Sequence, residues 1–159
     1  MQQIALASAD EMDIVAEIVR QTIETVYPHY YPSGAVAFFL HHHQPDAIAA
    51  DISKKIVYLL KNDDTPVGTV TMRDNEICRL FVLPQYQGQG FGRALLDFAE
   101  DSIFQHCSEI VIDASLAAKS IYLRRGYHET AYHKIETENG DFLCYDFMVK
   151  SRDAKGGRS

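Results

Sequence analysis

The chain has 159 residues, of which 47% are hydrophobic and 23% are charged, and its formal net charge is −7. This length suits one domain with a single buried core, and the composition is typical of a globular protein rather than a repeat or disordered chain. The acidic balance argues against binding to duplex nucleic acid, because such binders need Lys and Arg to replace the counterions of the phosphates. An acidic surface is better suited to cationic small molecules.

The cysteines and the hydropathy pattern indicate the cellular compartment. Cys78, Cys107 and Cys144 are odd in number, far apart and without C-x-x-C spacing, so they predict neither a disulfide framework nor a zinc site. Residues 1–9 lack a basic region followed by a long apolar run, and no stretch approaches the roughly 20 apolar residues of a membrane-spanning helix. We therefore expect a cytoplasmic protein that does not associate with a membrane.

The N-terminal third has helical periodicity. Ser8 and Glu11 form an S-x-x-E capping box ahead of regularly spaced apolar residues, and this helix should stop at Tyr27-Pro28. The predicted elements here are a strand at 3–7, a helix from Ser8 to Tyr27, a second helix from about Ser33 to before Pro45, and one or two helical turns over 46–55.

The period then changes to two, which is typical of strands. Turn-forming residues separate three such segments and predict an antiparallel meander. The later elements include two strands joined by Asn139-Gly140, a pair that favours a type I′ hairpin. The predicted elements are strands at 56–60, 67–72 and 76–83, a helix from Phe91, a strand at 109–112, a helix at 117–124 ended by Gly126, and strands at 127–138 and 141–149.

This order of elements mixes an antiparallel meander with one strand-helix-strand crossover. It predicts a single α/β (α+β) domain over residues 1–150 with a mixed central sheet, followed by a flexible C-terminal tail over 151–159.

Three glycines, Gly88, Gly90 and Gly92, alternate between a predicted strand and an amphipathic helix. Glycines let successive backbone N–H groups turn toward an anion, and the N-terminus of the helix adds to the attraction. A P-loop would require Lys and then Ser or Thr after the last glycine, and a dinucleotide fingerprint would require glycine at position 93, where the chain has Arg93-Ala94. The alternative is a turn that only connects a strand to a helix.

Two blocks carry a resemblance to a known family. The stretch from Leu80 to Gly92 resembles the acetyl-CoA pyrophosphate motif of GNAT acetyltransferases, Q/R-x-x-G-x-G/A, with the match at 87–92. The stretch from Ser115 to Tyr127 resembles the family's N-x-x-A-x-x-x-Y-x-x-x-G-F element. It departs at Ser115, where the family most often has Asn, and at Tyr127, where it often has Phe. The resemblance covers about residues 56 to 149, and loosely the two N-terminal helices.

The resemblance implies a GNAT-like mixed, mainly antiparallel sheet flanked by helices, and acetyl-CoA as co-substrate. It implies an N-acetyltransferase in which a primary amine of a small metabolite, amino acid, peptide or protein attacks the thioester directly. The alternative is a non-catalytic acyl-CoA-binding or sensor module of the same fold. The residues that the resemblance assigns to the cofactor are Leu80, Phe81, Val82, Gln87, Gly88, Gln89, Gly90, Phe91, Gly92, Arg93, Ser115, Ala118 and Tyr122.

Two residues are candidates for proton transfer. Tyr122 falls on the Tyr of the second block, and a phenol can donate a proton to a departing thiolate in a dry site; the alternative is a core aromatic. Glu76 falls where histone-type members of the family carry a general base, and the alternative is an exposed strand-end glutamate. Other members take a base from the strand at 109–112, where this chain has Ile110.

Aromatic residues between Tyr27 and Phe39 fall where the family's variable helices cover the acceptor site. Tyr27, Tyr30 and Tyr31 are therefore candidates for binding an amine through cation–π contact or stacking, and core packing is the alternative.

The histidine run 41–43 predicts no metal site, because consecutive helical residues point about 100° apart. His128 and His133 are expected on opposite faces of a strand and give no chelate either. The final strands could pair across a homodimer.

Overall fold

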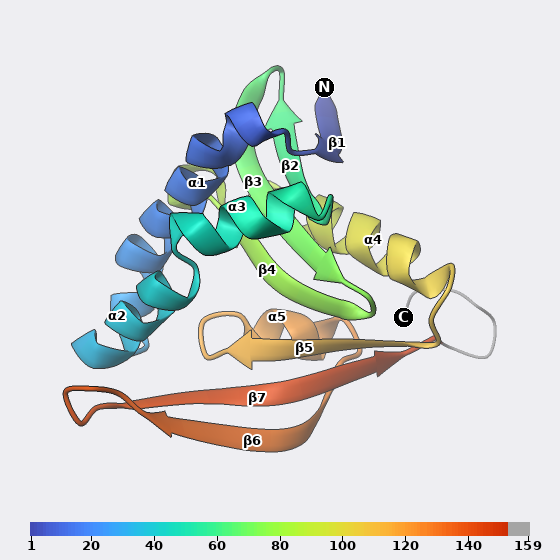
Figure 1. Cartoon of the computed structure of the whole chain (residues 1–159). Coiled ribbons are helices and arrows are strands. Elements are labelled where there is room, and N and C mark those ends of the chain that lie inside the picture. Colours follow the sequence, from blue (N-terminus) through green and yellow to red (C-terminus); the bar gives the residue numbers. More distant parts are fainter. Residues whose placement is uncertain (153–159) are drawn as a thin grey trace.

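A seven-stranded sheet in the order β1-β2-β3-β4-β5-β7-β6 forms the centre of the molecule (Figure 1). The structure is a computed structural model and describes residues 1–152. The strands are β1 (Gln2–Leu6), β2 (Val57–Asn62), β3 (Thr65–Arg73), β4 (Glu76–Val82), β5 (Glu109–Ser115), β6 (His128–Glu136) and β7 (Phe142–Ser151). The helices are α1 (Met12–Val26), α2 (Ser33–His42), α3 (Pro45–Ser53), α4 (Phe91–Phe104) and α5 (Lys119–Arg124).

Helices cover both faces of the sheet (Figure 1). On one face, α4 buries Leu95, Leu96 and Ala99 against the strands. On the other face, α1 buries Ile18 and Ile23, and α2 and α3 complete that layer. Helices α1 and α4 form because their apolar residues recur at helical spacing and lie on one side. The predicted fold class, a mixed and mainly antiparallel sheet flanked by helices, is confirmed.

The contact between β4 and β5 is parallel and very short. Only Glu76 with Val111 and Ile77 with Ile112 are paired, whereas the other neighbouring strands pair antiparallel. After Ile77 the two strands diverge, and in Figure 1 β4 runs up and away from β5. The remaining length of β4, from Cys78 to Val82, therefore presents one backbone edge to an opening in the sheet.

Two local features differ from the predictions. The loop between β6 and β7 is not a type I′ turn, because only Gly140 of the Asn139-Gly140 pair has a positive φ, at 85°. The loop instead closes with the Thr137 N–H donating to the Asp141 carbonyl at 2.8 Å and the Gly140 N–H donating to the Thr137 carbonyl at 3.0 Å. A type I′ turn requires a positive φ at both central residues.

Strand β5 is longer than the predicted strand at 109–112, and it continues through Asp113, Ala114 and Ser115. Pairing with β7 extends the strand, because Asp113 lies opposite Phe147 and Ser115 lies opposite Tyr145. Asp is uncommon in strands, so the sequence pattern predicted that the strand would end before Asp113.

The C-terminal part of the chain is described as far as Arg152. Ser151 ends β7, and the Arg152 N–H donates to the Ser108 carbonyl at 2.8 Å. The rest of the predicted tail, residues 153–159, lies outside the described residues. No helix within residues 1–152 has both the length and the apolar character needed to cross a membrane.

Candidate active site

The glycine-rich turn leads from β4 into the N-terminus of α4. Gly88 and Gly90 have φ values of 78° and 90°, a left-handed conformation that glycine adopts without strain. The first intrahelical bond runs from the Ala94 N–H to the Gly90 carbonyl at 3.1 Å, so the N–H groups of residues 91–93 have no partner within the helix. A Cβ atom at Gly88 or Gly90 would meet no atom within 4 Å. This turn can hold an anion through backbone N–H groups.

A cavity of about 370 Å³, which we call the cofactor cavity, runs from this turn along β4 to α5. Two of the residues assigned to the cofactor lie outside its lining: Gln89 is exposed, and Phe91 is buried against Tyr86. The assigned residues that line it are Leu80, Phe81, Val82, Gln87, Gly88, Gly90, Gly92, Arg93, Ser115, Ala118 and Tyr122.

The free edge of β4 faces this cavity. The Leu83 N–H donates to the Val67 carbonyl of β3 at 2.9 Å, so by alternation the backbone groups of Val82 point the other way, toward the opening. The Val82 carbonyl accepts hydrogen bonds there from Gln87 Nε2 at 2.9 Å and from Thr22 Oγ1 at 3.3 Å. Gln87 thus ties the glycine-rich turn to the strand. An extended ligand with amide groups could pair with this edge as an added strand does.

A second cavity of about 560 Å³, the acceptor cavity, lies on the other side of the opening. A small cavity of about 70 Å³, the junction, shares Ser115 with both larger cavities, Tyr122 with the cofactor cavity and Asp113 with the acceptor cavity. The three cavities therefore adjoin one another at the gap between β4 and β5.

Two phenols meet at the junction. Tyr122 is 5% exposed, and burial raises its pKa well above the ordinary value, so the hydroxyl keeps its proton at neutral pH. Burial also raises the pKa of Tyr27, against the opposing effect of a hydrogen bond with Ser115. A protonated phenol at this point can donate a proton to a leaving group.

Three carboxylates line the acceptor cavity: Glu76 from β4, Asp113 from β5, and Asp51 from α3. Burial and then the charge of Asp113 raise the pKa of Glu76, and Arg73 acts against this shift. Burial raises the pKa of Asp113 as well. Sequence reasoning missed Asp113, although it precedes Ser115 by two residues and period-two geometry places both on one face of β5. The aromatic and aliphatic residues around the carboxylates are Phe38, Phe39, Ile77, Ile135, Leu143 and Tyr145.

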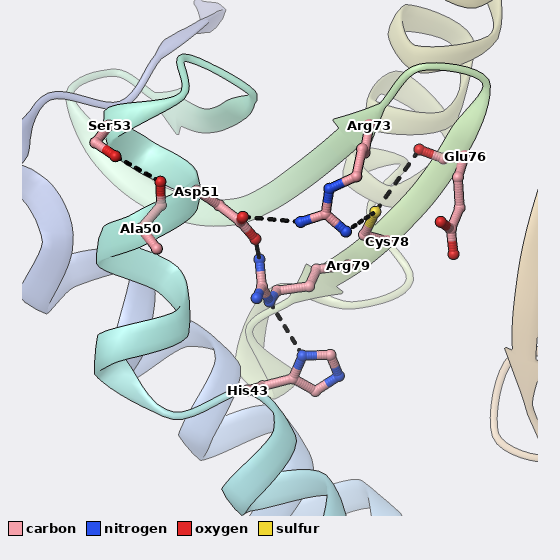
Figure 2. A network of polar contacts seen from close by, with 8 residues as sticks. All are labelled: His43, Ala50, Asp51, Ser53, Arg73, Glu76, Cys78 and Arg79. Carbon is pink, nitrogen blue, oxygen red and sulfur yellow. Dashed lines mark hydrogen bonds and ion pairs between the residues drawn. The ribbon is translucent and has the colours of Figure 1, made fainter.

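A charged network forms another part of the same cavity (Figure 2). Arg79 Nη1 contacts Asp51 Oδ2 at 2.5 Å, and Arg73 Nη2 contacts Asp51 Oδ1 at 2.8 Å. Arg79 Nε donates to Nδ1 of His43 at 3.0 Å. The sequence contained one signal for this network: Arg79 lies between Ile77 and Phe81 on the buried side of a predicted strand, where a charged residue needs a partner.

The three predicted acceptor-binding tyrosines separate in the structure. Tyr27 lines the cofactor cavity and the junction. Tyr31 is buried, donates its hydroxyl proton to the Cys144 carbonyl at 3.0 Å and accepts the Leu116 N–H at 2.7 Å. Tyr30 is 50% exposed and lies outside the lining of these cavities. Their part in acceptor binding stays a prediction.

The histidines are dispersed over different contacts. His42 stacks on Phe38 with ring centroids 6.1 Å apart, and His133 stacks on Tyr145 at 5.0 Å. Within residues 1–152, no group of three or more His, Cys, Asp or Glu side chains is arranged to hold a metal ion.

Comparisons with known proteins show the family and the fold of this chain. The model of the acetyltransferase (GNAT) domain family matches residues 26–145. The uncharacterized N-acetyltransferase YafP of Escherichia coli is 26% identical over 143 residues, which are 89% of this chain and 90% of YafP.

Two solved structures share the fold. One is a GCN5-related N-acetyltransferase from Rhodopseudomonas palustris, with a TM-score of 0.82, 23% identity and coverage of 95% of this chain and 94% of the other. The second is the PaiA N-acetyltransferase of Thermoplasma acidophilum in complex with coenzyme A, with a TM-score of 0.74, 18% identity and coverage of 95% and 99%. Because the family model spans most of the residues that build the cavities, the chain belongs to the GNAT acetyltransferase family.

Proposed function

We propose that the protein is an N-acetyltransferase that transfers the acetyl group of acetyl-CoA to a primary amine by direct attack. The observation that carries this proposal is the set of adjoining cavities at the gap between β4 and β5. One cavity contains the turn at Gly88 and Gly90, another is acidic and aromatic, and the small cavity between them is lined by Tyr122 and Ser115. Adjoining cavities suit a two-substrate transfer, because direct attack requires the two reacting groups to be held close together and aligned.

The residues of the cofactor cavity fit coenzyme A in kind. The N–H groups of residues 91–93 and the open space beside Gly88 and Gly90 suit a pyrophosphate. The free edge of β4 at Val82 suits the amide groups of a pantetheine arm. The relative from Thermoplasma acidophilum was solved with coenzyme A. Acetyl-CoA would supply an activated acyl group at the junction.

The residues of the acceptor cavity fit an amine. Glu76 and Asp113 attract an ammonium group, and either carboxylate, directly or through water, can take the proton that the nitrogen loses as the N–C bond forms. Tyr122 supplies a proton to the sulfur as the C–S bond breaks. An ammonium group first loses one proton to a carboxylate or to water, and the neutral amine loses a second proton as it attacks. One proton reaches the sulfur, so transfer to an ammonium group releases one net proton.

The test is turnover of purified protein with acetyl-CoA and a panel of primary amines. Release of free thiol would be followed continuously, and mass spectrometry would identify the acetylated amine. Sustained, amine-dependent release is expected. Coenzyme A binding without release above the rate of hydrolysis would overturn the proposal and leave a non-catalytic binding module.

We place this activity in the cytoplasm. Cys78, Cys107 and Cys144 are all free, as expected of thiols in a reducing compartment. Fractionation of the native cells followed by immunoblotting would test the location.

A further inference from the structure

His43 lies at the end of α2, where a chain of buried charges reaches the acceptor cavity (Figure 2). Its Nδ1 atom is 3.0 Å from Nε of Arg79, and Arg79 in turn contacts the carboxylate of Asp51 at 2.5 Å. The side chains of Arg79 and Asp51 are 7% and 5% exposed, so this arrangement is sheltered from water. The His43 ring also packs edge-on against Phe81, with centroids 5.7 Å apart.

The contact with Arg79 determines which ring nitrogen of His43 carries the proton. A guanidinium group can only donate hydrogen bonds, so Nδ1 must be the acceptor and a neutral ring must carry its proton on Nε2. Burial, Arg79 and His42 lower the pKa of His43 to about 3, and Asp51 acts against them. His43 is therefore a neutral group with a single N–H donor.

That donor is accessible from the acceptor cavity. Nε2 of His43 has no hydrogen-bond partner among residues 1–152, and Thr71 Oγ1 is the only buried, unpartnered side-chain polar atom there. Nε2 is consequently open to the cavity that His43 lines, and in Figure 2 it lies on the side of the ring turned away from Arg79. The same reasoning leaves Nη2 of Arg79 accessible.

We propose that His43 recognises the acceptor by donating its Nε2–H to an oxygen that the acceptor carries close to the reacting amine, such as the carbonyl of an α-amino amide. Arg79 and Asp51 position this donor without touching the reacting atoms. The inference rests on the proposed function and names the acceptor class: an amine beside a hydrogen-bond-accepting oxygen, with an apolar or aromatic side chain.

The distribution of groups in the cavity supports this class. His43 and Arg79 offer donors and no free acceptor, so their complement must have lone pairs. Glu76 and Asp113 offer acceptors in the same cavity, so their complement is the ammonium group. Phe38 and the other aromatic residues provide apolar walls.

The loss of water from His43 Nε2 on binding should make the site selective for acceptors that carry an oxygen. An acceptor that enters the cavity displaces the water on His43 Nε2, and an acceptor without an oxygen leaves this donor unpaired. We expect at least tenfold weaker binding of such a compound.

The test compares phenylalaninamide with phenylethylamine, which share the aromatic group and differ in the carboxamide. Binding of each would be measured by calorimetry on the protein saturated with coenzyme A, for the wild type, His43→Leu and His43→Gln. In His43→Leu, the ratio of the affinity for phenylalaninamide to that for phenylethylamine should fall at least tenfold. His43→Gln should retain the wild-type ratio, because the Gln amide can accept from Arg79 and donate to the ligand. Comparing the ratio of the two affinities between variants cancels the different basicities of the amines.

His41→Leu is the matched control, because His41 lies in the last turn of α2, two residues before His43, and outside the lining of the acceptor cavity. It should leave the ratio unchanged. Long-range ¹H–¹⁵N correlation spectra of the wild type give a second measurement that requires no variant to fold. They should show His43 with a protonated Nε2, and the Nε2 signal should move with phenylalaninamide more than with phenylethylamine.

Four results would overturn the inference. They are a protonated Nδ1, equal affinity of the wild type for the two amines, failure to bind either amine, and a preference that persists in His43→Leu. The proposed function fails differently, through absence of coenzyme A binding or of amine-dependent thiol release. Turnover without any effect of His43 on the ratio would refute the inference alone.

Discussion

Lys150 Nζ lies 2.9 Å from Glu100 Oε1, and the two side chains are 2% and 0% exposed. The pair joins β7 to α4 in the interior. The Glu100 carboxylate also accepts from Arg125 Nε at 3.0 Å and from the Tyr127 hydroxyl at 3.1 Å. One buried anion thus faces two cations and a phenol.

Glu100→Gln should destabilise the protein more than Lys150→Met. The first change leaves Lys150 buried without its anion, which costs about 3 kcal/mol or more. The second removes one charged hydrogen bond and leaves Glu100 paired with Arg125, at a cost of about 1–2 kcal/mol. Urea unfolding at neutral pH measures both free energies, and the opposite order would show that Arg125 does not neutralise Glu100.

Gly90→Val should weaken coenzyme A binding by at least about tenfold, or ~1.4 kcal/mol. A β-branched residue is strained at the φ of 90° found here, and its side chain would stand beside the N–H groups at the start of α4. Calorimetry measures the affinity.

Gly140→Val is the matched control for backbone strain. Gly140 has a φ of 85° and open space around it, but it lies in the loop between β6 and β7. It should lose stability without losing affinity for coenzyme A. Wild-type affinity in folded Gly90→Val would mean that the cofactor site is misplaced.

Tyr122→Phe should lower kcat by about 10²-fold with little change in coenzyme A affinity, because the ring and its packing remain while the proton donor is lost. Steady-state kinetics and calorimetry separate the two effects. Tyr27→Phe is the informative comparison, since Tyr27 places a second phenol at the junction. A larger loss in Tyr27→Phe would assign the proton to Tyr27, and full activity in Tyr122→Phe would remove Tyr122 from the mechanism.

Glu76→Gln should reduce kcat/KM by about tenfold in the pH range in which Glu76 is deprotonated and the amine still carries a proton that a base must remove. A base acts only when deprotonated, and the pKa of Glu76 is raised by burial and by Asp113. Activity of the wild type should therefore begin to fall at a higher pH than an ordinary carboxyl group would give.

Asp113→Asn removes the neighbouring charge that raises the pKa of Glu76, so this fall should move to lower pH. The pH dependence of kcat/KM for the wild type and both variants measures the effect. Identical profiles in all three proteins would remove Glu76 from the mechanism.

Local patterns in the sequence determined much of this protein. The glycine-rich turn was readable because an anion-binding loop needs glycines at fixed spacing before a helix, and the structure gives Gly88 and Gly90 the positive φ values that such a turn requires. The capping box could also be predicted, because it depends on two residue types at a fixed spacing, and the Ser8 N–H does donate to Glu11 Oε1 at 3.0 Å. Helical and alternating periodicity predicted the helices and strands, because the burial of one face of an element requires apolar residues at regular spacing.

Only the tertiary structure decided how the site is assembled. The divergence of β4 from β5 depends on pairing between segments more than 30 positions apart, and no local pattern encodes it. Asp113 entered the site because β7 extends β5, and Arg79 found Asp51 and His43 on elements 28 and 36 positions away. Turn residues, caps and periodicity are local and can be read along the chain, whereas the meeting of charges across a sheet depends on how the elements pack.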